Sequence, residues 1–304
     1  MRQGRYSYHF DPVQACIMCG SPSAGHKVLG RRLNRSQGRS PRKAIGIATT
    51  IRRCTTCELV YSDPMPVPFD LQDHYGVPPE SYWKEEYFKL EANTLKEELE
   101  LAKTLLPDRA PIRALDVGAG IGKGMLAMTR AGFDTYGFEP STPFHERAIS
   151  RMGIPPDRLK LGMIEELDYP QDHFDFISFG VVLEHIYDPS AAIVKAMGWL
   201  KPGGVIHIEV PSAHWLVNRI VNFYYRLRGS EFVANLSPMH EPFHLHEFTL
   251  RAFQLHAQKH RYAIATHRFY VCKTFLPRIL DPVLKPIMRW TDTGMQLSIW
   301  LRKP

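Results

Sequence analysis

Apolar and polar positions alternate in a regular order through the middle of the chain. Between residues 112 and 211, short apolar runs take turns with segments of helical spacing, in the order RALDVG, KGMLAMTRAG, DTYGFEP, PFHERAISRM, RLKLG, FDFISFG, SAAIVKAMGWL and GGVIHIEVP. Short β-prone runs that alternate with helical segments are typical of βαβ units. The pattern therefore predicts an α/β fold built on a mostly parallel sheet.

Similar patterns flank this region on both sides. Apolar residues at helix-compatible spacing predict a helix from Ser81 to Leu106, and Pro107 ends it. Downstream, TLRAFQLHAQKH predicts another helix, and two final strands are expected near 262–271 and 295–302. Between those strands, FLPRILDPVLKPIMRW mixes apolar and basic residues that could touch a membrane or an acceptor lipid. Its three internal prolines favour a packed connection over an amphipathic helix.

The first 70 residues differ from the rest in composition. They combine paired cysteines with the basic stretch GRRLNRSQGRSPRK and close with the proline-rich DPMPVPFD. We therefore predict a small module and linker over residues 1–70. The α/β domain is predicted to span 71–304 and to carry an insertion on its substrate side at 211–248.

Positive charge is concentrated in the same module. The whole chain has a formal net charge of +7, whereas residues 1–60 hold 11 Lys and Arg against Asp11 and Glu58, a local charge of +9. Such a segment can face nucleic acid, a phosphorylated substrate or an anionic membrane, or remain a solvated loop. No run approaches the about 18 apolar residues of a transmembrane helix, and the first residues lack an apolar secretion signal. We therefore expect a cytoplasmic protein without a transmembrane segment.

Four of the five cysteines form two C-x-x-C pairs, Cys16 with Cys19 and Cys54 with Cys57. Two such pairs supply the four thiolates that zinc prefers in closed tetrahedral sites. The 34 residues between the pairs exceed the usual ribbon spacing, so we expect the basic stretch to be looped out of a zinc ribbon. Four sulfurs leave no position for water or substrate, so the predicted zinc is structural. Four unliganded reduced cysteines are the alternative.

The sharpest motif is LDVGAGIG at residues 115–122, an apolar strand that passes into a glycine loop and then a helix. Its glycines allow a tight turn and a close approach of the backbone to a ligand. A dinucleotide fingerprint would need glycine where this chain has Lys123. Asp116 favours a ligand with a cationic amino-acid end over a pyrophosphate. Glu139, about twenty residues on, is placed to hold a ribose diol.

In order and spacing, five features of residues 112–211 resemble class I S-adenosylmethionine-dependent methyltransferases: Asp116, the glycine loop, Glu139, FDFI at 174–177 and LKPGG at 200–204. The resemblance implies a seven-stranded Rossmann-like sheet, mostly parallel with an antiparallel last strand. It also implies S-adenosyl-L-methionine as the cofactor. It assigns cofactor contacts to Asp116, Gly118, Gly120 and Glu139.

The resemblance extends to positions near the adenine and the sulfonium. In the family, residues after the third strand flank the adenine, and this chain has Met163 and Ile164 in place of the common acidic and small pair. Adenine contacts there are expected to be apolar or through the backbone. The LEHI segment after the fourth strand is similar to that of small-molecule methyltransferases, which implies that Gly180 and Val181 lie near the sulfonium.

Methyl transfer is an in-line displacement, so the protein must align the acceptor and remove its proton. The histidine-rich segment MHEPFHLHEFT at 239–249 is expected at the carboxyl edge of the sheet, where α/β proteins bind ligands. Its H-L and F-T residues resemble those of sugar methyltransferases, and His244 is the first candidate for the general base. Phe243 stands where those enzymes carry an acid, so Glu241 or His240 could substitute.

Other interpretations of these residues stay open. The histidines can instead cap, or pack beneath, the helix that begins near Thr249. Alternatively, His240, His244 and His246 can form a metal site. The LEH residues 183–185 are interpreted as packing at a helix start.

The context CIMCGSP with RRCTTCELVYSDPMP resembles the zinc-binding domain of bacterial methyltransferases that act on sugar nucleotides, polysaccharides or natural products. The resemblance implies methyl transfer to a hydroxyl or carbon of a small molecule such as a saccharide or phosphorylated sugar. One alternative is an rRNA or tRNA methyltransferase that grips RNA with the basic ribbon. Another is a non-enzymatic binding protein on a methyltransferase scaffold, against which the intact glycine loop and Glu139 argue. The oligomeric state stays open.

Overall fold

A seven-stranded sheet forms the centre of the protein in a computed structural model that describes residues 7–33, 47–70 and 83–304. Its order is β12-β13-β10-β9-β6-β7-β8. The strands are β6 (Arg113–Val117), β7 (Asp134–Glu139), β8 (Leu159–Leu161), β9 (Phe174–Gly180), β10 (Leu200–Pro211), β12 (Ala263–Tyr270) and β13 (Gln296–Arg302). Within this sheet β13 alone runs against its neighbours, pairing antiparallel with β10 and β12. The predicted α/β fold and its antiparallel last strand are confirmed.

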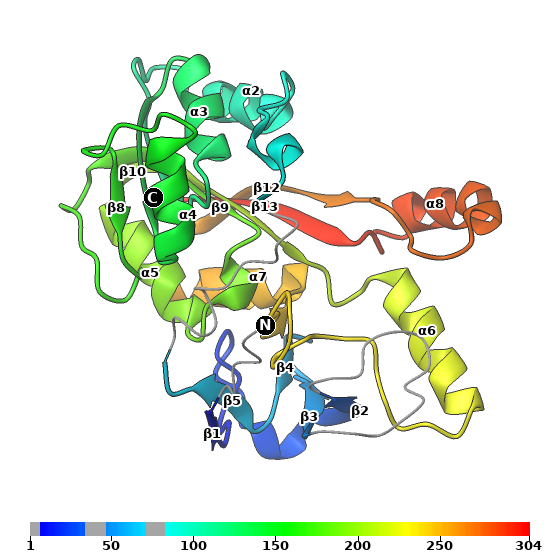
Figure 1. Ribbon diagram of the computed structural model, residues 1–304. Helices are drawn as coiled ribbons and strands as arrows, with labels where there is room; N and C mark the ends of the chain where they lie inside the picture. Colours follow the sequence, from blue (N-terminus) through cyan, green and yellow to red (C-terminus); the bar gives the residue numbers. More distant parts are fainter. Residues whose placement is uncertain (1–6, 34–46, 71–82) are drawn as a thin grey trace.

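Helices cover both faces of the sheet. They are α2 (Lys96–Leu105), α3 (Lys123–Arg130), α4 (Thr142–Ser150), α5 (Pro189–Trp199) and α7 (Leu250–His260). Consecutive strand residues point to opposite faces, so Ile177 and Phe179 pack with α5 and α7, while Phe176 packs with α2 and α3. Figure 1 shows α2 and α3 on one side of the sheet and α5 and α7 on the other. The result is a three-layer α/β/α domain in which each face of the sheet packs against an apolar core.

The N-terminal module contains two small sheets. In the first, β1 (Tyr8–Asp11) pairs with β5 (Met65–Pro68). The second has the order β11-β4-β3-β2. Its strands are β2 (Lys27–Leu33), β3 (Ala48–Arg53), β4 (Val60–Ser62) and β11 (His246–Glu247). A short 3-10 turn, η1 (Ser23–Gly25), precedes β2. Strand β11 lies far from the other three strands in the sequence, after β10 of the α/β domain. The predicted module therefore shares a sheet with the predicted domain.

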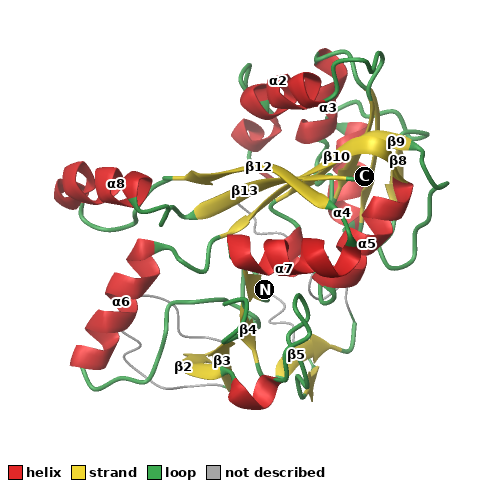
Figure 2. Ribbon diagram, turned by 180° about the vertical axis from the view of Figure 1, so that it is seen from behind, coloured by secondary structure: helices red, strands yellow, loops and turns green. Residues whose placement is uncertain are grey.

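The segment after β10 contacts both edge strands of the four-stranded sheet. It forms α6 (Leu216–Leu227) and then runs beside β2, where Arg31 N–H donates to the Glu231 carbonyl (2.9 Å) and Val233 N–H donates to the Arg31 carbonyl (3.0 Å). Gly30 permits this approach, because a Cβ there would collide with the same Glu231 carbonyl. At the opposite edge β11 pairs with β4. Figure 2 shows the module beneath α7 with α6 at its side.

Two predicted elements were wrong. The helix predicted from Ser81 to Leu106 is the shorter α2, preceded by the 3-10 turn η3 (Glu85–Phe88), because Leu95 has a left-handed φ of +53° that breaks the helix; Ser81 itself lies outside the described residues. The connection predicted after β12 is instead a 3-10 turn, η5 (Arg278–Leu280), and a helix, α8 (Asp281–Trp290).

Helix α8 forms despite its prolines because of where they fall. Pro282 lies in the first turn, where a backbone N–H would have no partner within the helix, and Pro286 removes a single internal hydrogen bond. The final strands near 262–271 and 295–302 are confirmed as β12 and β13. None of the helices in the described ranges combines the length and apolar composition needed to cross a membrane.

Candidate active site and metal centre

The glycine loop between β6 and α3 is shaped for a close ligand. Gly118, Gly120 and Gly122 have positive φ values of +65°, +57° and +83°, which glycine adopts without a Cβ clash. A Cβ on Gly118 would lie 2.8 Å from a Val182 methyl, and one on Gly122 would lie 2.6 Å from Ile154 Cγ1. A Cβ on Gly120 would meet nothing within 4 Å. The space beside Gly120 is therefore open to a bound molecule.

Two buried carboxyl groups lie beside this loop. Glu139, at the end of β7, accepts hydrogen bonds from the backbone N–H groups of Gly120 (2.7 Å) and Ser141 (2.8 Å). Burial raises the pKa of Glu139 to about 7. Burial, together with the charge of Glu139, raises the pKa of Asp116 to about 7. Since a carboxylate oxygen accepts more than one hydrogen bond, the pair suits a ligand that carries hydroxyl and ammonium groups.

The remaining predicted cofactor positions lie at the carboxyl ends of neighbouring strands. Met163 and Ile164 follow β8, with Ile164 buried and Met163 half-buried. Gly180 ends β9, and Val181 follows with a φ of +59°, a strained conformation for a β-branched residue. Backbone strain of this kind clusters at functional sites. Val182 touches Gly118, so the end of β9 lies against the glycine loop.

Glu184, His185 and His244 form a compact cluster just beyond β9. Glu184 and His185 lie in the 3-10 turn η4 (Leu183–His185), and the Leu245 N–H donates to the Glu184 carbonyl (2.8 Å), which draws His244 to the same place. Glu184 Oε1 is 3.9 Å from Nε2 of both histidines. Glu184 is fully buried, and neither carboxyl oxygen has a hydrogen-bond partner among the residues that the structure describes.

Burial sets the protonation of this cluster. It raises the pKa of Glu184 to about 8, with a further contribution from the charge of Glu209. It lowers the pKa of His185 to about 4, and lowers that of His244, with the charges of His185 and His240, to about 3. Both imidazoles are therefore neutral at pH 7, the form that accepts a proton. The three ligand atoms also lie within 4.8 Å of one another, close enough to share a metal ion.

A cavity of about 250 Å³ opens beside the cluster. Val181 and His244 line it, and the other walls come from distant parts of the chain: Arg32 from β2, Trp215 ahead of α6, Glu247 from β11 and Gln296 from β13. Buried Glu247 accepts hydrogen bonds from Asn218 Nδ2 and the Leu236 N–H, both at 3.2 Å. The N-terminal module and the insertion thus both contribute to one cavity beside the end of β9.

The other histidine-segment candidates are not members of this cluster. His240 Nε2 is 3.4 Å from a guanidinium nitrogen of Arg32, and burial together with the Arg32 charge lowers the pKa of His240 to about 4. Glu241 is exposed. The metal site suggested for His240, His244 and His246 is wrong, because in the described part of the chain the groups close enough to hold a metal are the four cysteines and Glu184, His185 and His244.

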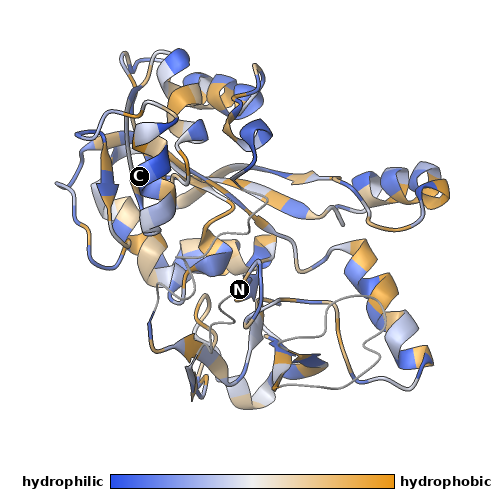
Figure 3. Ribbon diagram, viewed as in Figure 1, coloured by the Kyte–Doolittle hydropathy of each residue, from blue (hydrophilic) through white to orange (hydrophobic). Residues whose placement is uncertain are grey.

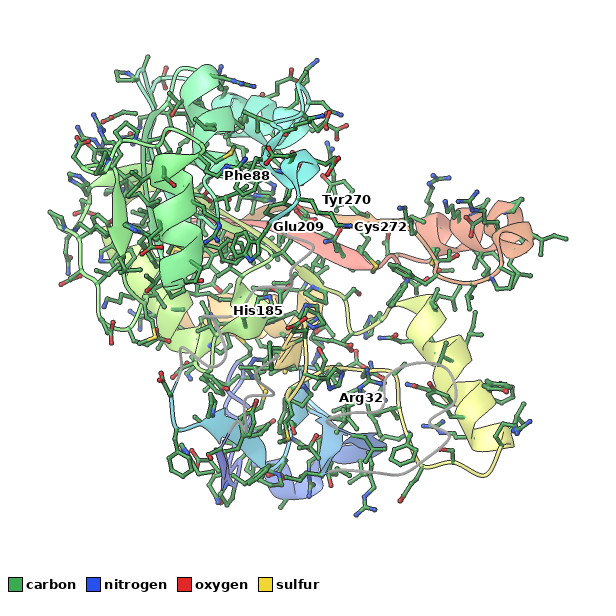
Figure 4. All side chains as sticks on the ribbon, viewed as in Figure 1. Arg32, Phe88, His185, Glu209, Tyr270 and Cys272 are labelled. Atoms are coloured by element: carbon green, nitrogen blue, oxygen red, sulfur yellow. The ribbon has the colours of Figure 1, made fainter. Side chains whose placement is uncertain are left out.

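Sequence reasoning missed several groups at this site. Glu184 and His185 had been interpreted as packing residues, although the LEH segment was noted. Arg32 and Glu209 carry no local sequence pattern that marks them. Figure 4 shows His185 between the sheet and the N-terminal module, Arg32 within that module, and Glu209 near the carboxyl ends of the strands.

The four cysteine sulfurs of the module converge on one point. Cys16 Sγ lies 3.4 Å from Cys57 Sγ, and Cys19 Sγ lies 3.6 Å from Cys54 Sγ. A tetrahedron of sulfurs about 2.3 Å from zinc has edges of about 3.8 Å. The Thr56 and Cys57 N–H groups point at Cys54 Sγ, each at 3.4 Å. The cysteine cluster is thus consistent with a structural zinc site.

The cysteine cluster packs into the core of the α/β domain. Cys16, Cys54 and Cys57 belong to the same buried cluster as Phe248 and Phe253. The link is made at the start of α7. There Thr249 Oγ1 donates to the Cys57 carbonyl (2.6 Å) and accepts from Ala252 N–H (3.0 Å) as the helix cap, while Arg251 Nε donates to the Thr56 carbonyl (2.7 Å).

Comparison with known proteins identifies the α/β domain. Residues 90–267 match the family described as Methyltransferase domain. The ubiquinone biosynthesis O-methyltransferases of Rhodopseudomonas palustris and Bradyrhizobium sp. are 27% and 28% identical over 131 residues, which cover 42% of this chain and 49% of each relative. The chain therefore spans about half the length of the curated relatives it matches. The uncharacterized methyltransferase YcgJ of Bacillus subtilis is 28% identical over 152 residues, covering 48% of this chain and 55% of that protein.

Two solved structures are similar to this chain over more than two thirds of its length. A chain from the complex of a Haloferax volcanii methyltransferase with its activator has a TM-score of 0.50 and 15% identity, covering 75% of this chain and 100% of that one. An S-adenosylmethionine-dependent methyltransferase from Mesorhizobium loti has a TM-score of 0.48 and 16% identity, covering 71% of this chain and 100% of that one. Because the family match covers more than half of the sequence, the chain belongs to the methyltransferase-domain family.

Proposed function

We propose that the protein methylates a hydroxyl oxygen or a carbon atom of a small molecule, and that this acceptor is a saccharide, a sugar nucleotide or a related natural product. The observation that carries the proposal is the 250 Å³ cavity beside Val181. Its wall combines the charged side chains of Arg32 and Glu247 and the amide of Gln296 with the indole ring of Trp215. A pocket with several buried polar groups favours an acceptor that can hydrogen-bond to each of them.

We assign the cofactor to the glycine loop and the adjacent strand ends. Glu139 would hold the ribose diol, because its Oε2 accepts from the Gly120 N–H of the loop, its Oε1 accepts from the Ser141 N–H, and both oxygens retain hydrogen-bonding capacity. Asp116 would face the amino-acid end, and Met163 with Ile164 would flank the adenine. Gly180 and Val181 would then lie beside the reacting methyl group. The open space at Gly120 supports this assignment.

We assign His244 as the general base. When bound, S-adenosylmethionine supplies an electrophilic methyl group on its sulfonium. The imidazole of His244, which is neutral at pH 7, would take the proton from the acceptor's hydroxyl oxygen or carbon. Glu184, 3.9 Å from Nε2, is placed to stabilise the imidazolium once its carboxyl is ionised.

We assign positioning roles to two further groups. His240 lies against Arg32 and would fix the guanidinium at the cavity wall. His185 lies on the other side of Glu184 and would orient its carboxyl group. The exposed Glu241 stays the alternative base. The activity named for the curated relatives, ubiquinone biosynthesis O-methyltransferase, supports a hydroxyl acceptor.

The test measures transfer of labelled methyl from S-adenosylmethionine to sugar nucleotides, phenolic small molecules and bulk rRNA and tRNA. We expect transfer to sugar nucleotides. His244→Gln should then lower kcat about 10² to 10⁴-fold while cofactor affinity stays near that of the wild type. His267→Gln is the matched control, since His267 is exposed on β12. Transfer to RNA alone, with affinity that falls steeply with salt, would overturn the proposed acceptor class.

A further inference from the structure

Large apolar side chains that solvent reaches are concentrated on two segments at one end of the molecule. We call these segments, residues 216–228 and 273–292, the α6–α8 surface. Its exposed apolar side chains are Ile220, Phe223, Tyr224, Leu227, Phe275, Ile279, Leu280, Val283, Ile287 and Trp290. Monomeric soluble proteins rarely leave so large an apolar patch uncovered, and such patches mark protein or membrane interaction sites.

The exposed residues follow helical spacing in both helices. In α6, Ile220, Phe223, Tyr224 and Leu227 recur three and four residues apart, whereas the inward face is formed by other residues, among them Val217 and Tyr225. Leu227 is 70% exposed. The residues on this outward face therefore do not serve the core.

The second segment repeats the arrangement. Ile279, Val283, Ile287 and Trp290 are spaced four, four and three residues apart through η5 and α8, while Met288 points inward and is buried. Ile279 is 84% exposed and Trp290 is 87% exposed. Figure 3 shows hydrophobic and hydrophilic residues alternating along both helices.

Basic side chains accompany the apolar ones. The two segments together carry seven Lys and Arg, namely Arg219, Arg226, Arg228, Lys273, Arg278, Lys285 and Arg289. Against them stand Asp281, which pairs with Lys285 at 3.2 Å, and Asp292. The α6–α8 surface therefore has a formal net charge of +5 and attracts an anionic partner.

The two helices lie at the same end of the molecule. Figures 1 and 2 both show α6 and α8 projecting at the same end, away from α3 and α4. A cavity of about 580 Å³ joins them, lined by Ile220 and Phe223 of α6 and Ile287 of α8. Arg219 and Arg226 line the same cavity, so cationic groups stand beside its apolar walls.

We propose that the α6–α8 surface docks the protein on an anionic phospholipid membrane. Trp290, Ile279 and Phe223 would enter the boundary between headgroups and acyl chains, and the arginines would contact phosphates. Amphipathic helices with Lys and Arg around an apolar, tryptophan-containing face bind membrane interfaces in this way. A second copy of the chain fits less well, because a symmetric contact would bring two surfaces of charge +5 together.

The docking surface adjoins the proposed acceptor cavity. Asn218 lines both that cavity and the groove between α6 and α8. Trp215, at the acceptor cavity, packs edge-on against Phe275 with ring centroids 6.3 Å apart. The membrane-docking proposal does not depend on the acceptor, since binding to lipid can be measured without cofactor or substrate.

The test is flotation of the purified, zinc-loaded chain with vesicles of phosphatidylcholine and phosphatidylglycerol at a ratio of about 3:1, which gives an anionic surface. Vesicles of phosphatidylcholine alone are the comparison. We expect at least tenfold stronger partitioning onto the anionic vesicles, weakening as salt rises. The double variant Ile279→Ser/Trp290→Ser should reduce partitioning at least tenfold. Val28→Ser is the control, because Val28 is an exposed apolar residue of the N-terminal module.

Two results would overturn the proposal. In the first, the wild type fails to float with anionic vesicles at low salt, or the double variant floats as well as the wild type does. In the second, light scattering finds a dimer that the double variant converts to a monomer, with no vesicle binding by the wild type. Circular dichroism of the double variant establishes that it folds, since both substituted side chains are exposed.

Discussion

Replacement of Thr249 by valine tests whether the zinc centre and the methyltransferase core are one structure. The Thr249 hydroxyl caps α7 and also donates to the carbonyl of Cys57, one of the four predicted zinc ligands. Loss of a helix cap costs about 1 kcal/mol, and a buried carbonyl left without a partner costs about 1 to 3 kcal/mol. Valine preserves the shape of threonine, so we expect Thr249→Val to lower the free energy of unfolding by about 3 kcal/mol.

The assay is urea unfolding of the zinc-loaded protein, followed by circular dichroism and by tryptophan fluorescence. Thr249→Ser keeps the hydroxyl and loses one methyl, so it should cost about 1 kcal/mol. The valine variant should also release zinc to a chelator faster than the serine variant does. The reasoning fails if the two variants unfold at the same urea concentration, or if the wild-type module and domain unfold in separate transitions.

Three further predictions concern the metal centre, the glycine loop and the candidate base. The protein should purify with one zinc per chain, and Cys16→Ser should lower both zinc content, measured by atomic absorption, and stability; a metal-free wild type of equal stability would contradict the zinc assignment. Gly122→Ala should destabilise the fold by about 1 to 3 kcal/mol in urea, because its Cβ would meet Ile154 at a φ of +83°; an unchanged midpoint would contradict the observed packing. The pKa of Glu184 is about 8, and its ionised form would stabilise a protonated His244. We therefore expect kcat to rise with pH through about 8 in the wild type and to lose that rise in Glu184→Gln. An identical pH profile in both proteins would remove Glu184 from the mechanism.

The sheet could be predicted from the sequence because parallel strands buried on both faces appear as continuous apolar runs. FDFISFG and GGVIHIEVP are such runs, and they form β9 and the end of β10. The paired cysteines were equally informative, because the C-x-x-C spacing itself places two sulfurs on one side of a tight turn. Both features are local, so one sequence suffices to find them.

Contacts between distant segments could not be predicted in the same way. The pairing of β11 with β4 joins residues 246–247 to residues 60–61, and no local periodicity encodes it. The same holds for the cluster of Glu184, His185 and His244. His244 was predicted from its own segment, whereas its neighbour Glu184 becomes apparent only when the Leu245 N–H bonds to the Glu184 carbonyl.

Helix α8 shows a different limit. Counting prolines predicted a connection without a helix, but the cost of a proline depends on its position in the helix. Pro282 lies in the first turn and costs no hydrogen bond. The exposed apolar face of this helix also violates the usual inward placement of apolar residues, so pattern alone could not separate a docking surface from a core element.

Calorimetric titration of S-adenosylhomocysteine tests the central claim most directly, that the glycine loop and Glu139 form the cofactor site. The titration is made into the wild type, Glu139→Ala and the control Glu166→Ala, which changes an exposed residue, with NAD as comparison ligand. We predict binding of S-adenosylhomocysteine alone, weakened at least tenfold, or about 1.4 kcal/mol, by Glu139→Ala and unchanged by Glu166→Ala. Preference for NAD, or equal affinity in all three proteins, would contradict the account.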